Sequence, residues 1–180
     1  HEACYMQDRT GASLEEIDSA VKFKLGFPMG IFELADFTGM DVIHKATVEM
    51  HLRDKKVINP HKTIEKMFDE KKLGQKSGEG YYKYSDDKYE RVELSEELAQ
   101  KCNPIQLVAN VLNNAAWLIT NGASDIEEIE KAAKLGLGLR KPLFETAKEI
   151  GLQNIVDELN NLAQEHGEFY KPDRLLETMI

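Results

Sequence analysis

With 32 acidic and 23 basic side chains in 180 residues, the chain has a net charge of -9, which argues against a general nucleic-acid binder because phosphate neutralisation needs a basic face. No apolar run approaches the roughly 20 residues that a membrane-spanning helix needs, and the first residues do not resemble a signal peptide. We therefore expect a soluble, intracellular and cytoplasmic protein of one ordinary domain or two small ones, with no nucleic acid or membrane among its partners.

The first helix that the sequence predicts with a clear start signal begins at Leu14. Ser13 and Glu16 form a capping box, in which the serine hydroxyl accepts from a first-turn amide and the glutamate reaches back to the cap amide. Gly26 followed by Pro28 predicts the end of this helix. Its buried stripe would consist of apolar residues at helical spacing, namely Leu14, Ile17, Ala20, Val21 and Leu25.

Further elements follow up to the middle of the chain. A short helix containing Phe32 and Glu33 should end at Gly39. An amphipathic helix comes next, with the apolar stripe Val42, Ile43, Ala46, Thr47 and Met50. Glycines and tyrosines in residues 74–84 then predict a tight turn that leads into a short hairpin or extended piece.

A long helix should begin near Pro104, because proline is favoured in the first turn. After it, the chain repeats itself. Gly11-Ala12-Ser13 returns as Gly122-Ala123-Ser124, and Phe32-Glu33 returns as Phe144-Glu145, at offsets of 111 and 112 residues. Similarity at a fixed spacing indicates repeated architecture, so we expect two tandem helical units, residues 1–92 and 93–180.

The second unit should contain the same elements as the first. Ser124 opens a helix in the way Ser13 does, Gly138 ends it, and a short helix then ends at Gly151. By the same alignment, the helix before the first repeat would begin about eight residues upstream of His1. We therefore expect the chain to be part of a longer protein. The apolar stripes of the second unit are Ile126, Ile129, Ala132, Ala133 and Leu137, and then Ile155, Val156, Leu159, Leu162 and Ala163.

Two glycine motifs resemble nucleotide-binding loops but lack their context. Gly136-Leu137-Gly138 closes a predicted helix and no strand precedes it, whereas a dinucleotide fingerprint follows a strand. Residues 74–77 lack the glycine spacing of a phosphate loop. We expect no cofactor-binding residue in this chain.

The cysteines and histidines do not form a metal or nucleophile motif. Cys4 and Cys102 lie in unrelated contexts, which predicts free buried thiols. His44 and His51 could share one helix face, but this spacing is loose, and we interpret them as surface or half-buried residues rather than zinc ligands. The sequence therefore predicts no metal site and no catalytic residue.

The turn before Phe32 differs between the two repeats. The first repeat has Pro28-Met29-Gly30, and the second has Arg140-Lys141-Pro142. An apolar turn with little side-chain bulk suits the close approach of a flexible hydrocarbon, and methionine adapts to variable shapes. The alternative is a hinge between two helices, with Phe32 and Leu34 in the core.

Three segments together resemble the C-terminal domain of NAD-dependent 3-hydroxyacyl-CoA dehydrogenases. The resemblance covers nearly the whole chain, because larger members of that family carry the helical domain twice in tandem. It is specific in the first repeat and degraded in the second, where the glycine-rich hairpin shrinks to residues 167–172. The matching segments are Glu2-Ala3, Gly26-x-Pro28-Met29-Gly30-x-Phe32-Glu33-Leu34-x-Asp36-x-x-Gly39-x-Asp41 and Lys72-x-Gly74-x-Lys76-Ser77-Gly78-x-Gly80-Tyr81-Tyr82.

This resemblance implies an all-α fold of the 6-phosphogluconate dehydrogenase C-terminal-domain type. It also implies an N-terminal Rossmann domain that binds NAD and carries the His-Glu pair and the assisting Asn, none of which is present here. For this chain it implies an acyl-CoA substrate wall formed by Pro28, Met29, Gly30 and Leu34, with Phe32 packed behind them. The second unit would complete an intrachain pseudo-dimer, and an enoyl-CoA hydratase domain could follow Ile180.

The resemblance predicts oxidation of (S)-3-hydroxyacyl-CoA to 3-oxoacyl-CoA in fatty-acid metabolism by a larger protein, with the isolated chain inactive because it lacks base and cofactor. Two alternatives stay open. One is a stand-alone helical interaction module that kept the fold and lost the chemistry. The other is the same domain on a related 3-hydroxyacid dehydrogenase with a non-CoA substrate.

Overall fold

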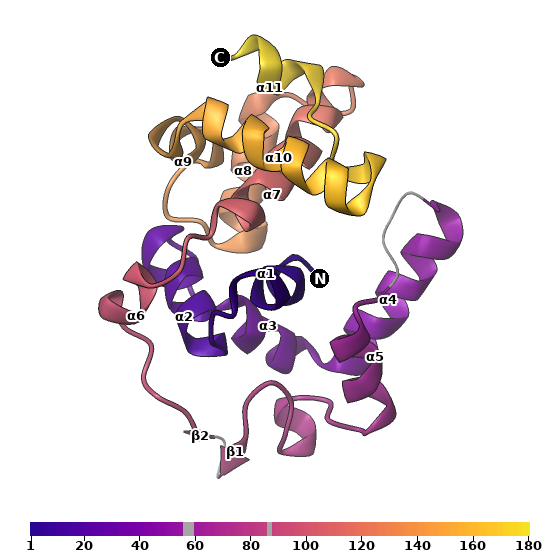
Figure 1. Cartoon of the computed structure of the whole chain (residues 1–180), viewed down its shortest axis with the longest axis vertical. Coiled ribbons are helices and arrows are strands. Elements are labelled where there is room, and N and C mark those ends of the chain that lie inside the picture. The colour runs from indigo at the N-terminus through magenta and orange to yellow at the C-terminus, as the bar shows by residue number, and fades with distance from the viewer. Residues whose placement is uncertain (56–59, 86–87) are drawn as a thin grey trace. The chain divides into compact units, whose positions relative to one another are not determined.

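The computed structural model describes residues 1–55, 60–85 and 88–180, and the chain divides into two compact units (Figure 1). Unit 1 comprises His1–Lys24 and Met29–Cys102, and unit 2 comprises Leu25–Pro28 and Asn103–Ile180. Helices dominate both units, and in the described ranges the only strands are β1 (Tyr84–Ser85) and β2 (Lys88–Tyr89), which pair antiparallel. The predicted all-α fold is confirmed, and the predicted domain limits at residues 92 and 93 stay a prediction.

Unit 1 holds six of the described α-helices, most of them short. The predicted start at Leu14 is confirmed, since Ser13 and Glu16 make both hydrogen bonds of the capping box. After Ser19 the helix widens into a π-helical turn, Ala20–Lys24. The helices are α1 (Glu2–Thr10), α2 (Leu14–Ser19), α3 (Ile31–Thr38), α4 (Met40–Arg53), α5 (Lys62–Asp69) and α6 (Glu96–Gln100).

The amphipathic helix predicted after Gly39 is present as α4, but of its predicted stripe only Thr47 is buried. Met40 and Thr47 are the buried residues of α4, whereas Val42 and Met50 are 51% and 55% exposed. Met40 and Thr47 lie seven residues apart, so they share a face that contacts α3 and α5. Val42, Ala46 and Met50 of the predicted stripe therefore lie at the surface of unit 1.

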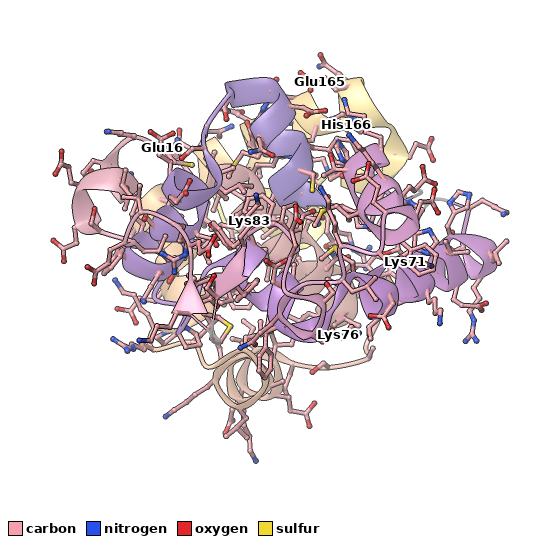
Figure 2. The ribbon with its side chains drawn as sticks, turned by 90° about the horizontal axis from the view of Figure 1, so that it is seen from below. Glu16, Lys71, Lys76, Lys83, Glu165 and His166 are labelled. Atoms are coloured by element: carbon pink, nitrogen blue, oxygen red, sulfur yellow. The ribbon has the colours of Figure 1, made fainter. Side chains whose placement is uncertain are left out.

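The glycine-rich segment after α5 forms the predicted tight turn. Gly74 and Gly78 have positive φ angles of 92° and 78°, which glycine adopts without steric cost. A short 3₁₀ turn, Gln75–Ser77, lies between them. Lys76 in this turn pairs with Asp41 in the first turn of α4, and Figure 2 shows the side chain of Lys76 at the surface.

Unit 2 repeats this plan with longer helices. The predicted long helix begins at Ile105, and the short helix ends at Gly151 as predicted. The cap of α8 is Asp125 rather than Ser124, because the carboxylate of Asp125 accepts from the amide of Glu128 at 2.8 Å. The helices are α7 (Ile105–Thr120), α8 (Ile126–Leu137), α9 (Leu143–Ile150), α10 (Leu152–His166) and α11 (Arg174–Thr178), with a 3₁₀ turn at Glu168–Tyr170.

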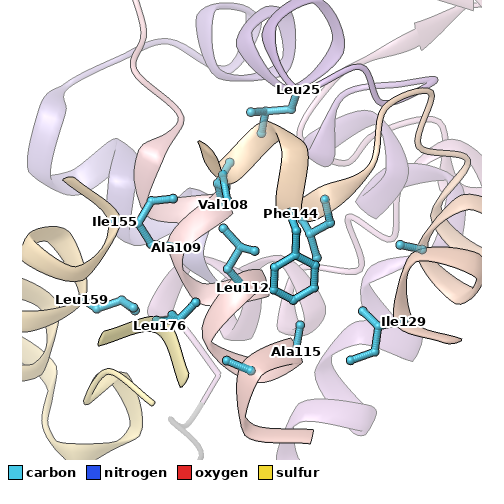
Figure 3. Close-up of a cluster of buried hydrophobic side chains, with 14 of the residues drawn as sticks. Leu25, Val108, Ala109, Leu112, Ala115, Ile129, Phe144, Ile155, Leu159 and Leu176 are labelled. Atoms are coloured by element: carbon cyan, nitrogen blue, oxygen red, sulfur yellow. The ribbon is translucent and has the colours of Figure 1, made fainter. Parts of the chain in front are cut away.

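The core of unit 2 is an apolar cluster that gathers α7, α8, α9 and α10 (Figure 3). On α10 the predicted stripe is buried, whereas Ile126 and Leu137 at the ends of the α8 stripe are 46% and 44% exposed. Ala132, in the middle of the α8 stripe, is exposed as well, so only Ile129 and Ala133 of that stripe are buried. Core members include Leu25, Val108, Leu112, Ile129, Phe144, Ile155, Leu159 and Leu176.

Two predictions about the chain as a whole can be compared with these units. Cys4 and Cys102 are both free and buried, as predicted. No helix in the described residues is long and apolar enough to cross a membrane.

Candidate functional site

The candidate site is the turn that leads into α3. Its four predicted residues differ from one another in exposure, and they do not all belong to the same unit. In unit 1, Gly30 is buried, Met29 is half-buried, and Leu34 on α3 is 41% exposed. Pro28 is exposed and belongs to unit 2, where it lies so close to Gly138 that a Cβ on this glycine would approach the ring at 3.2 Å. Of the predicted residues in unit 1, Leu34 and part of Met29 are therefore accessible, whereas Gly30 is buried.

A buried carboxylate, Asp18 on α2, holds the first turn of α3. Its oxygens accept from the amides of Phe32 at 2.8 Å and Glu33 at 3.1 Å, which would otherwise lack partners at a helix N-terminus. The hydroxyl of Tyr82 donates to the same carboxylate at 2.9 Å. Burial, together with the nearby charge of Glu33, raises the pKa of Asp18 to about 7 although these three donors oppose the rise.

Gly30 lies directly against this carboxylate. A Cβ at position 30 would fall 2.1 Å from Cγ of Asp18, so no other residue fits without moving Asp18. The amide of Gly30 donates to Glu33 Oε2 at 2.8 Å, which is the glutamate half of a capping box, while the Glu33 amide donates to Asp18 because glycine has no side chain to accept it. The other oxygen of Glu33 pairs with the guanidinium of Arg91, and both side chains are less than a tenth exposed. The turn is thus fixed on both sides by buried charged groups.

Asp36, one turn further along α3, ties the tyrosine segment to this helix. Its carboxylate accepts from the amides of Tyr81 at 2.8 Å and Tyr82 at 2.9 Å, and from the hydroxyl of Tyr84 at 2.9 Å. Burial raises the pKa of Asp36. A Cβ on Gly80 would lie 2.1 Å from Asp36 Oδ1, so glycine allows this close approach.

Unit 2 keeps the carboxylate support but not the apolar turn. Glu130, 112 residues after Asp18, accepts from the amides of Leu143 at 2.7 Å and Phe144 at 2.8 Å at the start of α9. The two repeats therefore share a carboxylate on the preceding helix that caps the short helix. Sequence reasoning missed this role, although the acidic residue recurring at the offset of 112 was a usable signal.

The surface beside the turn is apolar. Phe32 is buried and its ring contacts that of Tyr81, with centroids 4.5 Å apart. Leu34 and Phe37 are on the outer face of α3, three residues apart, and Phe37 is 69% exposed. A rigid turn flanked by exposed apolar side chains can contact a hydrocarbon group.

The histidines of unit 1 have structural contacts. His61 accepts from the amide of Thr63 at 3.2 Å as the cap of α5, and its other ring nitrogen lies 3.3 Å from a carboxylate oxygen of Asp8. His44 stacks on Phe68 with ring centroids 4.2 Å apart. In the part of the chain that the structure describes, no three His, Cys, Asp or Glu side chains gather into a candidate metal site.

The glycines at the end of α8 do not fit NAD. Gly138 is the left-handed cap that ends α8, with φ at 67°, and the segment before it is helical. A dinucleotide pyrophosphate is bound where a glycine-rich turn joins a strand to a helix, and α8 offers no such turn. No step of a reaction is therefore assigned to this cofactor within the chain.

Comparison with known proteins decides the family. The model of the 3-hydroxyacyl-CoA dehydrogenase C-terminal domain matches residues 1–84 and 106–180, one stretch in each half of the chain. The chain belongs to this family. The matched stretches include the turn before α3 and its counterpart before α9.

Relatives of this 3-hydroxyacyl-CoA dehydrogenase domain include whole enzymes. Hydroxyacyl-coenzyme A dehydrogenase, mitochondrial, from Rattus norvegicus is 40% identical over 85 residues, which covers 46% of this chain and 27% of the relative. The protein of the same description from Homo sapiens gives the same identity and coverage. The chain thus spans about a quarter of the length of the curated relatives that it matches.

Solved structures confirm the fold of the domain. The 3-hydroxybutyryl-CoA dehydrogenase of Escherichia coli K12 has a TM-score of 0.75 and 21% identity, covering 99% of this chain and 56% of that one. The dehydrogenase part of multifunctional enzyme 1 from C. elegans has a TM-score of 0.64 and 21% identity, covering 99% and 45%. At this identity the likeness concerns the fold alone.

Proposed function

We propose that the chain is the acyl-contacting and dimerising part of an NAD-dependent 3-hydroxyacyl-CoA dehydrogenase that oxidises (S)-3-hydroxyacyl-CoA to 3-oxoacyl-CoA in fatty-acid β-oxidation. The observation that carries the proposal is the turn before α3. There, in a chain of this family, buried carboxylates hold the amides of Gly30 and Phe32, between the half-buried Met29 and the exposed Leu34. A rigid apolar wall of this kind orients a hydrocarbon chain at little entropic cost.

In this proposal Met29, Gly30 and Leu34 contact the acyl chain, Pro28 joins them from the preceding residue, and Phe32 supports the wall from behind. NAD, the base that takes the hydroxyl proton and the rest of the active site come from an N-terminal Rossmann domain outside this chain. We expect the isolated chain to be inactive, because a wall without base or cofactor lowers no barrier.

The second unit would act as the counterpart of the first in an intrachain pseudo-dimer, and an enoyl-CoA hydratase domain could be a further partner. The cytoplasmic location stays a prediction, since the matched relatives include enzymes described as mitochondrial. These assignments rest on the family and on the difference between the two turns, Pro28-Met29-Gly30 and Arg140-Lys141-Pro142.

The test is an NADH-linked assay with acetoacetyl-CoA and its longer 3-oxoacyl homologues, on the complete gene product and on the 180-residue chain. We expect NADH oxidation only with the former. Leu34→Glu should lower kcat/KM for the longer homologues about tenfold, since a charge facing a hydrocarbon chain costs at least 1.4 kcal/mol.

Leu135→Glu is the matched control, because Leu135 is an exposed leucine of unit 2 and should leave kcat/KM unchanged. An inert complete product would refute the dehydrogenase and favour the interaction module. Turnover of 3-hydroxyacids without CoA, in preference to acyl-CoA, would favour the non-CoA dehydrogenase instead.

A further inference from the structure

Arg91 has an unusual position for a charged residue. Its side chain is only 9% exposed, and its guanidinium carbon lies 5.1 Å from the ring centroid of Tyr82 and 4.4 Å from that of Tyr89. One terminal nitrogen donates to the carbonyl of Val92 at 2.9 Å. Arginine stacks on aromatic rings in this way because its planar cation is weakly hydrated. The two rings and the Val92 carbonyl alone therefore fix the position of the Arg91 side chain.

That remaining contact is with Glu33, 58 residues earlier in the chain. Each oxygen of this buried carboxylate has one partner, Arg91 for Oε1 and the amide of Gly30 for Oε2. An unpaired buried carboxylate costs several kcal/mol, so Glu33 stays in this position only while a cation faces it. The carboxylate of Glu33 thus connects the guanidinium of Arg91 to the backbone of Gly30.

A second buried carboxylate, that of Asp18, lies beside the same turn. Asp18 holds the amides of Phe32 and Glu33, and Gly30 lies against it. Asp18 on α2 and Glu33 on α3 are two buried carboxylates beside the same helix start, and the charge of Glu33 contributes to the raised pKa of Asp18. Arg91 offsets the charge of Glu33, the residue that holds the Gly30 amide.

The second unit shows what accompanies the loss of the apolar turn. The position of Gly30 is taken by Pro142, which has no amide hydrogen to donate. The position of Glu33 is taken by Glu145, which is exposed. The buried glutamate and the donating glycine are thus features of the unit that also carries Met29.

We propose that Arg91 is a positioning residue for the acyl chain: through Glu33 it fixes the Gly30 amide, and thereby holds Met29 against the substrate and sets which acyl lengths are accepted. This inference rests on the proposed function. Arg91 itself touches neither substrate nor cofactor, and its effect passes through Glu33 and the turn.

The test compares Arg91→Met and Arg91→Lys in the complete gene product, with KM and kcat measured for acetoacetyl-CoA and longer 3-oxoacyl homologues. Arg91→Met should raise KM about tenfold for the long homologues, change kcat less than about twofold, and flatten the dependence on acyl length. Arg91→Lys should lie between Arg91→Met and the wild type, because lysine keeps the charge and loses the planar stacking. Arg53→Met is the matched control, since Arg53 is an exposed arginine of unit 1 that pairs with Glu49.

A second variant addresses the case in which Arg91→Met does not fold. Glu33→Gln combined with Arg91→Met leaves an amide oxygen for the Gly30 amide and removes the charge that needed a partner. We expect this double variant to fold and to recover most of the wild-type KM.

Each result has one meaning. If Arg91→Met, or Arg91→Lys where Arg91→Met does not fold, shows the same KM and acyl-length profile as Arg53→Met together with an unaltered Gly30 amide exchange rate, the positioning role is wrong while the dehydrogenase stands. A double variant that folds but keeps a KM raised about tenfold for the long homologues also contradicts the positioning role. If the wild-type product shows no turnover, the proposed function itself fails and the inference fails with it. A fall in kcat that is equal at every acyl length, with KM unchanged, would also overturn the inference, since a loss of folded protein has that effect.

Discussion

Replacement of Asp18 by asparagine changes how the stability of unit 1 depends on pH. Burial raises the pKa of Asp18 from 3.8 to about 7, so the folded chain binds this proton more tightly than the unfolded chain does. Between about pH 4 and pH 7 the free energy of unfolding should therefore fall as pH rises. At about 1.4 kcal/mol per pKa unit, the full difference approaches 4 kcal/mol as an order of magnitude.

The Asp18→Asn variant carries no charge at any pH and should lack this slope. Charges remote from Asp18 contribute equally to both proteins and cancel in the difference in unfolding free energy between wild type and variant, which therefore reports on Asp18 and its immediate surroundings. We expect that difference to favour the wild type most near pH 4 and to shift toward the variant by several kcal/mol near pH 7.5.

Hydrogen exchange of the Phe32 and Glu33 amides, measured across this pH range, reports on the turn that Asp18 caps. Urea unfolding followed by circular dichroism gives the free energy. The Leu143 and Phe144 amides of unit 2 serve as the internal reference, because Glu130 holds them. A stability difference that stays constant with pH, or that grows in favour of the wild type as pH rises, would refute the reasoning.

Two further predictions concern single side chains of unit 1. Lys71, whose φ is 60°, follows α5 where glycine is usual, so Lys71→Gly should raise the free energy of unfolding by about 0.5–1 kcal/mol in urea titrations, and a loss of stability would contradict this. Phe32→Ala should cost about 3–5 kcal/mol because Phe32 is 2% exposed, whereas Phe37→Ala in the same helix should change stability by less than about 0.5 kcal/mol. Equal effects of the two substitutions in thermal unfolding would show that the faces of α3 are assigned incorrectly.

Local signals made much of the fold predictable from the sequence. The capping box at Ser13 and the glycines at 39, 138 and 151 act within a few residues of the helix ends that they determine, so they can be read without tertiary contacts. The repeat supplied the rest, because each signal occurs twice. The misplaced cap at Ser124 shows the limit, since Asp125 is an equally good cap one residue later.

The direction in which a helix face points was less predictable. The stripe of α4 has helical spacing, yet Val42 and Met50 are exposed, because the neighbours of a helix decide which face is buried. The short helices α5, α6 and α11 have five to eight residues, too few for a periodic pattern.

The candidate site was also predictable from the sequence only in part. The turn residues Met29 and Gly30 stood out because the two repeats differ there. The groups that hold the turn come from far along the chain: Tyr82 is 64 residues from Asp18, and Arg91 is 58 residues from Glu33. No spacing rule connects residues so far apart, so their roles became visible only in the fold.

The exchange of Gly30 for proline in the second repeat bears on how duplicated domains evolve. A proline at this position has no amide hydrogen to donate, so a buried glutamate facing it would bring cost without benefit, and the counterpart Glu145 is exposed. The reverse path is much harder, because a restored glycine regains its bond only if the glutamate is already buried and a distant arginine already faces it. Loss of the apolar turn in one copy is therefore difficult to reverse by single substitutions. Selection for this turn then acts on the first copy alone.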